Sequence, residues 1–115
     1  MPDQGVDVSF DPNAEPQFTF VPDTVTMTAA GKIVLHRRPQ IAPWTFKEGS
    51  IKGNGSTQFS STVHGNGSLL HIHDEFRDEF MARHPYTITV EFNGKDYVSP
   101  DPVIVNDPGT GGTAP

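Results

Sequence analysis

The amino-acid sequence predicts an all-β protein, a single β-sandwich of seven to eight short strands with one short helix. The segment 86–98 alternates apolar and polar residues on both sides of Asn93-Gly94. This pattern is typical of a β-hairpin, because both central residues of a type I′ turn need a positive φ. The 11 glycines and 11 prolines in 115 residues, with only 34% hydrophobic residues, indicate many short strands and turns.

Alternation also predicts the other strands in chain order. Apolar residues recur at every second position in short segments that glycine, proline or polar residues interrupt. We expect a polar, glycine-rich loop over 49–56 and a hairpin that turns at 65–67. The segments that alternate in this way, from which the seven to eight strands are expected, are 6–10, 18–20, 24–29, 32–38, 44–46, 58–64, 69–73, 86–92, 95–98 and 103–105. The core residues expected from this pattern are Phe18, Phe20, Trp44, Phe46, Phe59, Ile88 and Val90.

One segment carries a helical pattern. Asp74 is a candidate N-cap, Phe76 and Phe80 fall on one helical face, and Pro85 ends the segment. A helical turn, then Tyr86 at the start of a strand, then a hairpin resembles the end of an immunoglobulin-like antiparallel β-sandwich. The sequence contains no cysteine, so the likeness is one of architecture alone.

Length and charge limit the classes of function. A chain of this length supports one core, so we expect a β-sandwich domain over 1–106 and a flexible Gly/Thr/Pro tail over 107–115. A net charge of −6 with scattered Lys and Arg argues against a nucleic-acid partner. The N-terminal segment has no basic and apolar leader, and no window is apolar enough to enter a membrane. These features predict a cytoplasmic protein.

A histidine pair is the strongest candidate for chemistry. His71 and His73 share one face of their strand, and imidazoles in this arrangement can hold a metal ion such as zinc, iron or copper. His64 and Glu79 are candidates for the remaining ligands, and the set resembles the first motif of the cupins. The other interpretation is that Leu70 and Ile72 face the core while both imidazoles lie in solvent.

Two further features are candidates for binding. In the predicted hairpin register Glu91 lies opposite Asp96, so the pair is either solvated or meets a cation or a basic partner. Trp44 stands in a proline-flanked segment. An exposed Trp44 would favour carbohydrate or peptide binding, whereas a buried one would belong to the scaffold.

Three short motifs together resemble the small bacterial DP-EP family. They are the segment 15–20, which contains Glu-Pro and Phe-x-Phe, the Gly-x-Ile at 31–33, and the segment 99–106 with its Ser-x-Asp-Pro-x-Ile-x-Asn pattern. That family is functionally uncharacterised, so the resemblance implies a bacterial β-sandwich and assigns no site residues.

These observations favour a binding or protein-interaction module whose loops or sheet edges form the working surface. The partner is expected to be an unknown protein or small ligand, with no catalytic residues and no cofactor. Exposed edges are expected at the strands 6–10 and 103–105, which makes a homodimer plausible. The alternative is an enzyme with a divalent transition metal on the His71 and His73 face.

Overall fold

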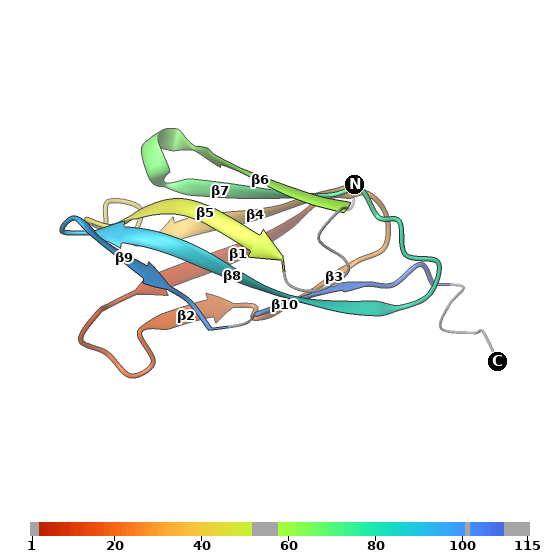
Figure 1. The fold of residues 1–115 in the computed structure, drawn as a ribbon, viewed down its shortest axis with the longest axis horizontal. Coiled ribbons are helices and arrows are strands. Elements are labelled where there is room, and N and C mark those ends of the chain that lie inside the picture. Colours follow the sequence, from red (N-terminus) through yellow and green to blue (C-terminus); the bar gives the residue numbers. More distant parts are fainter. Residues whose placement is uncertain (1–2, 52–57, 101, 110–115) are drawn as a thin grey trace.

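Ten β-strands form two facing sheets in the computed structural model, which describes residues 3–51, 58–100 and 102–109 (Figure 1). The first sheet has the order β2-β1-β4-β7-β6. Only β1 and β4 are parallel neighbours in it; its other pairs are antiparallel. Its strands are β1 (Gln4–Phe10), β2 (Phe18–Val21), β4 (Gly31–Arg38), β6 (Phe59–His64) and β7 (Leu69–Asp74).

The second sheet has the order β3-β10-β8-β5 and is built around the long strand β8. One side of β8 pairs with β5, and the other side pairs with β9 and then β10. The bounds are β3 (Thr24–Met27), β5 (Thr45–Ile51), β8 (Ala82–Phe92), β9 (Lys95–Val98) and β10 (Val103–Asn106). The all-β prediction is confirmed, but both sheets are mixed, because β3 also runs parallel to β10.

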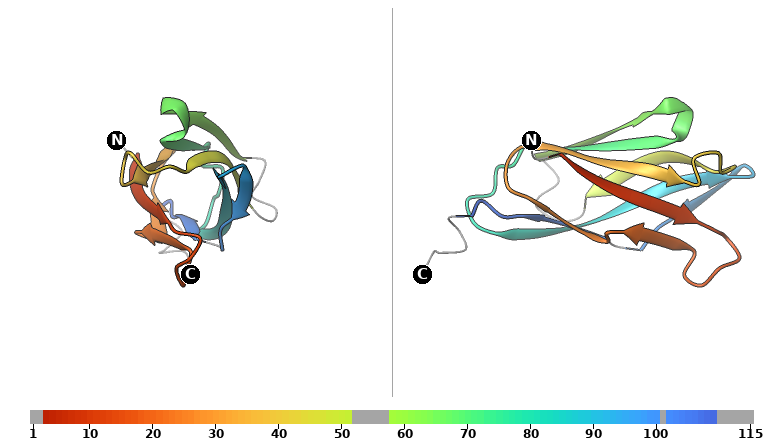
Figure 2. Two further views of the ribbon diagram at one scale, coloured as in Figure 1. Left: turned by 90° about the vertical axis from the view of Figure 1, so that its left-hand side faces the viewer. Right: turned by 180° about the vertical axis from the view of Figure 1, so that it is seen from behind.

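Figure 2 shows the ribbon from one end and from behind, with the strands arranged around a common interior. The core residues that fill this interior are those that alternate inward along the strands. Of the expected core residues, Trp44, Phe46, Ile88, Val90 and Phe18 are buried. Phe20 and Phe59 are partly buried and pack against the core from its margin. The remaining buried apolar residues come mainly from both sheets' inner faces: Val6, Val8, Phe10, Val25, Met27, Ile33, Leu35, Ala42, Leu70, Ile72, Tyr86, Ile104 and Val105.

The hairpin between β8 and β9 forms in the predicted register. Phe92 lies opposite Lys95, and Glu91 opposite Asp96. Asn93 has a φ of 53° and Gly94 a φ of 76°, the positive values that a type I′ turn requires. The hairpin between β6 and β7 also forms, and its turn contains a short 3₁₀ helix, η2 (Gly65–Gly67).

The helix expected after Asp74 is not formed. Residues 75–81 are irregular, Phe76 has a φ of 58° that no α-helix accommodates, and β8 already begins at Ala82. Pro85 lies inside β8 instead of ending a helix. It fits there because Tyr86 N bonds to Pro102 O, so the neighbouring Pro85 nitrogen points away from β10.

The predicted edge strands and one predicted loop are also wrong. β1 lies between β2 and β4, and β10 lies between β3 and β8, so neither is an edge. Residues 49–51 belong to β5, and the rest of the expected loop, 52–56, falls outside the described residues. Asp107 N donates to Met27 O, while the expected tail from 110 onward is also outside the described part of the chain.

The two seams between the sheets differ. On one side, the edge strands β5 and β6 meet, and Ser61 Oγ bonds to both N and O of Gly49. On the other side, β2 faces Pro100 and Pro102 across a pocket. Among the described residues no helix is long and apolar enough to cross a membrane.

Candidate functional site

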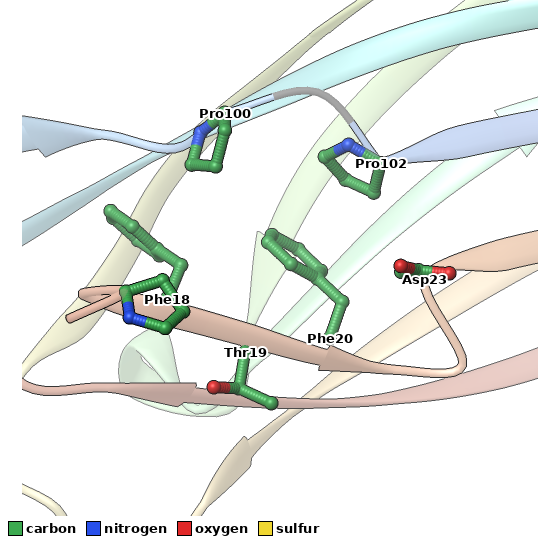
Figure 3. Close-up of a pocket in the computed structure, with 7 residues that line it drawn as sticks. Phe18, Thr19, Phe20, Asp23, Pro100 and Pro102 are labelled. Atoms are coloured by element: carbon green, nitrogen blue, oxygen red, sulfur yellow. The ribbon is translucent and has the colours of Figure 1, made fainter.

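A pocket of about 290 Å³ opens along the free side of β2. Figure 3 shows Phe18 and Phe20 pointing from β2 toward Pro100 and Pro102, with Asp23 at one end. Most of the residues that line the pocket are rigid and apolar, namely prolines and phenylalanines. The lining consists of Pro16, Phe18, Thr19, Phe20, Asp23, Pro100 and Pro102. We call this pocket, together with the free edge of β2, the β2 groove.

The backbone of β2 offers hydrogen-bonding groups at this groove. Asp11 N bonds to Gln17 O, and the antiparallel register pairs Phe10 with Phe18 and Ser9 with Thr19. Hydrogen-bonded and non-hydrogen-bonded pairs alternate along such a ladder. The N–H and C=O groups of Phe18 and Phe20 therefore point away from β1, toward the open side of the strand.

Aromatic packing holds the groove wall in place. The rings of Phe18 and Phe20 are stacked with their centroids 6.4 Å apart. Phe20 in turn meets the ring of Tyr86 edge-on, with a centroid distance of 6.2 Å. The wall thus rests on the core strand β8, so its side chains are positioned before any ligand arrives.

Tyr86 is a buried polar group beneath this wall. Its side chain is fully buried, and its hydroxyl has no hydrogen-bond partner among the described residues. Burial raises the pKa of the Tyr86 phenol, and the carboxylate of Asp23 raises it further. A buried hydroxyl without a partner costs about 1–3 kcal/mol, so Tyr86 is a donor for which the described fold supplies no acceptor.

Two smaller hollows continue from the β2 groove around the β1–β2 connection. The first, of about 170 Å³, shares Pro16 and Thr19 with the groove. The second, of about 250 Å³, has Trp44 in its wall. Trp44 is 2% exposed and packs edge-on against Phe46, so the exposed tryptophan that would favour ligand stacking is not found. The exposed surface here comes from prolines rather than from an aromatic platform.

The histidines gather on the outer face of the first sheet. The rings of His64 and His71 lie 4.1 Å apart, and those of His71 and His73 lie 6.3 Å apart. Thr62 Oγ1 lies 3.0 Å from His64 Nε2 and 3.5 Å from His73 Nε2. His64 therefore joins the predicted pair, whereas Glu79 is exposed in the segment between β7 and β8.

The electrostatics of this face favour the neutral form of His71. Partial burial lowers the pKa of His71, and the neighbouring positive charges of protonated His64 and of Lys32 lower it further. No group of three or more His, Cys, Asp or Glu side chains in the described part of the chain has a geometry that could hold a metal ion. The three rings are close, but His64 and His73 both contact Thr62, and the ring of His71 lies tilted to that of His64 and edge-on to that of His73.

The acidic pair of the hairpin meets a cation from its own chain. Lys47 Nζ lies 2.9 Å and 3.1 Å from the two carboxylate oxygens of Asp96. Lys47 reaches this position from an irregularity in β5 between Phe46 and Glu48. A hydrogen bond and the negative charge of Asp96 raise the pKa of Lys47, with a smaller contribution from Glu91. The sequence pattern of the hairpin carried no sign of Lys47, because a β-bulge places it there.

A buried polar cluster was missed by the sequence analysis. Its members come from separate segments: Gln58, Asp74, Asp78, His84 and Asn106. Asn106 Nδ2 lies within hydrogen-bonding distance of Asp74 Oδ1 and Asp78 Oδ2, and His84 Nε2 lies 2.7 Å from Asp78 Oδ2. The spacing of these residues follows no motif, so only the fold brings them together.

This cluster anchors the irregular segment 75–81. Phe76 N donates to Asp74 Oδ1, and Arg77 N donates to Gln58 Oε1. Burial raises the pKa of Asp74, and the hydrogen bonds from Phe76 N and Asn106 only partly offset that effect. Asp74 Oδ2 and Asn106 Oδ1 are buried and have no partner among the described residues. The arrangement stabilises the end of the sandwich by holding the segment 75–81 against it.

Comparisons with known proteins give little guidance. No protein-family model matches the chain, and no curated protein matches it. Among solved structures, the chain is similar to one described as the N-terminal domain of phage TP901-1 ORF48, with 10% sequence identity and a TM-score of 0.40. The match covers 93% of this chain and 98% of that chain. A likeness at this level carries no argument about function.

Proposed function

We propose that the protein is a binding module that captures an extended polypeptide segment along the free edge of β2. One observation carries the proposal: an aromatic and proline-lined pocket lies beside a strand edge whose hydrogen-bonding groups at Phe18 and Phe20 point outward. Extended peptides bind other proteins by adding a strand to such an edge, while adjacent pockets take alternate side chains.

The composition of the β2 groove supports this mode of binding. An incoming strand would form backbone hydrogen bonds with Phe18 and Phe20 and place an apolar side chain against their rings. Full burial of such a side chain contributes about 1.5–3 kcal/mol. Pro100 and Pro102 have no N–H groups, so the opposite wall supplies apolar contact without competing for the backbone of the peptide.

The test uses capped peptides of about seven residues with a central leucine and N-methylation of alternate amides. We expect binding to shift the ¹H–¹⁵N resonances of Phe18 and Phe20, and N-methylation on the docking side to abolish it. Phe20→Ser should also abolish binding. Val63→Ser on the edge strand β6, which removes a partly exposed apolar side chain in the same way, should leave binding unchanged.

Two outcomes would refute strand addition. Peptides that bind equally well with either set of amides methylated would show that the backbone edge is not used. Binding of small apolar molecules but of no peptide would identify the groove as a small-ligand site instead.

A second candidate function is metal binding at the outer face of the first sheet; the 4.1 Å between the rings of His64 and His71 favours it, but the three imidazoles would have to turn to converge on one ion. Elemental analysis of the untagged protein and of a His71→Ala, His73→Ala double variant tests it. Stoichiometric metal that the double variant loses would support a metal site, whereas wild-type protein that retains no added zinc or copper would refute it. Several other properties stay predictions from the sequence. They are activity as a metalloenzyme, an immunoglobulin-like connectivity, a homodimer, a cytoplasmic location and membership of the DP-EP family.

A further inference from the structure

The charge around the β2 groove is acidic. Among the described residues of the pocket lining, Asp23 is the one ionisable residue, and its side chain is exposed. Glu15 is exposed and directly precedes Pro16 of the lining. The described acids at this groove and next to its lining therefore both carry negative charge.

From this arrangement we infer that the captured segment is basic: an extended polypeptide that places an apolar side chain between Phe18, Phe20 and the prolines, and a Lys or Arg side chain at Asp23. The inference rests on the proposed function and adds to it the chemistry of the partner. A cation at Asp23 would meet a carboxylate at the margin of an apolar pocket, where screening by water is weaker than on an open surface.

Charge also argues against a second copy of the chain as the occupant. Each molecule carries a formal net charge of −6. Pairing two β2 edges would bring two such negatively charged molecules together without a cation in the described pocket lining. The negative charge of this protein would attract a basic partner, which would increase both its affinity and its rate of association.

The spacing within the partner follows from strand geometry. Asp23 lies beyond the end of β2, and its carboxylate stands at one end of the pocket that Phe20 also lines (Figure 3). Side chains on one face of a docked strand recur every second residue, about 6.6 Å apart. The basic residue should therefore stand two or four positions from the apolar one, before it in an antiparallel segment and after it in a parallel one.

The experiment compares capped peptides of about seven residues that differ at one position. Each carries a central leucine, and the variable residue two or four positions away is lysine, glutamine or glutamate, in both orders. Binding is measured by titration calorimetry in low and physiological salt against wild-type protein, Asp23→Asn and the control Glu48→Gln. Glu48 is also an exposed acid, but it lies on β5, and β8 separates β5 from β9 and β10.

We expect the lysine peptide to bind about two- to fivefold more tightly than the glutamine peptide, as for a partly exposed ion pair. This preference should disappear in Asp23→Asn, weaken with salt, and persist in Glu48→Gln. Equal binding of all three peptides would overturn the inference about charge and leave the binding module intact. If none of the peptides binds, the proposed function fails with it. Concentration-dependent dimerisation that Phe20→Ser abolishes would instead identify a second copy as the occupant.

Discussion

Asp74 joins β7 to the following irregular segment through a carboxyl group that is almost fully buried. Burial raises its pKa, so the folded state favours the protonated acid more than the unfolded chain does. Between its unfolded pKa of 3.8 and the raised folded value, the folded protein binds more protons, and stability falls as the pH rises. The neutral form is the one that suits this site.

Substitutions at Asp74 should reflect that preference. Asp74→Ala removes the acceptor for Phe76 N and Asn106 Nδ2, and we expect it to lower the free energy of unfolding by about 1–3 kcal/mol. Asp74→Asn keeps an oxygen acceptor without a charge and should lose clearly less at pH 7. Urea unfolding of both variants measures this difference, and equal losses would contradict the role assigned to neutral Asp74.

His71 should titrate at an unusually low pH. Its pKa lies below the ordinary 6.5 because it is partly buried and next to His64. Protonation therefore favours the unfolded chain, so the stability that neutral His71 contributes is complete above about pH 6.5 and is lost as the pH falls from there through the folded pKa. An NMR titration of the histidines measures the pKa of His71, and His64→Gln should raise that pKa partway toward 6.5. No change in His64→Gln would leave burial and the charges of the other neighbours to explain the shift.

The alternation of β8 and β9 and their Asn93-Gly94 turn were predictable because neighbouring residues alone determine them. The segment after Asp74 was not. Phe76 and Phe80 have the spacing of a helical face, but Phe76 packs against the core with a positive φ while Phe80 is 62% exposed, so the two rings do not share one buried face. Here the hydrogen bonds from Phe76 N and Arg77 N to the side chains of Asp74 and Gln58 replace the backbone bonds of a helix.

Two turn glycines provide a matched test of the hairpins. Gly94 has a positive φ but open space where a Cβ would stand, so Gly94→Ala should cost about 1–2 kcal/mol for the left-handed conformation alone. Gly67 has a φ of 93°, and a Cβ there would lie 2.6 Å from Thr45 Cβ. Gly67→Ala should therefore cost distinctly more, measured as the free energy of unfolding in urea. Equal costs would mean that the β6–β7 turn moves away from β5 freely.

Over the whole molecule, the candidate site depends on which strands lie at the edges, and this is where sequence reasoning failed. Alternation of apolar and polar residues identifies a strand but does not tell which strands pair with it. We therefore expected β1 and β10 at the sheet edges, although each lies between two other strands. The β2 groove joins residues 16–23 to residues 100 and 102, segments that share no pattern. β1 pairs in parallel with β4, and between them the chain passes through β3, which belongs to the other sheet. No local sequence pattern indicates such a pairing.

Rates of amide hydrogen exchange should differ between the central strands and the edge strand β2. β1 and β8 have a neighbouring strand on each side, so their amides should exchange only through global unfolding. The amides of Phe18 and Phe20 should exchange orders of magnitude faster, because they point out of the sheet. Protection of Phe18 and Phe20 equal to that in β1 would show that the free edge of β2 is covered, for example by self-association.

The parallel pairing of β3 with β10 also determines when the protein can fold during its synthesis. β3 is made early, yet its partner ends at Asn106. At about 5–20 residues per second, the ribosome needs several seconds to make the intervening chain. Throughout that interval the inner face of β3, with Val25 and Met27, has no strand beside it. A nascent chain of this protein therefore cannot complete its second sheet until β10 has left the exit tunnel.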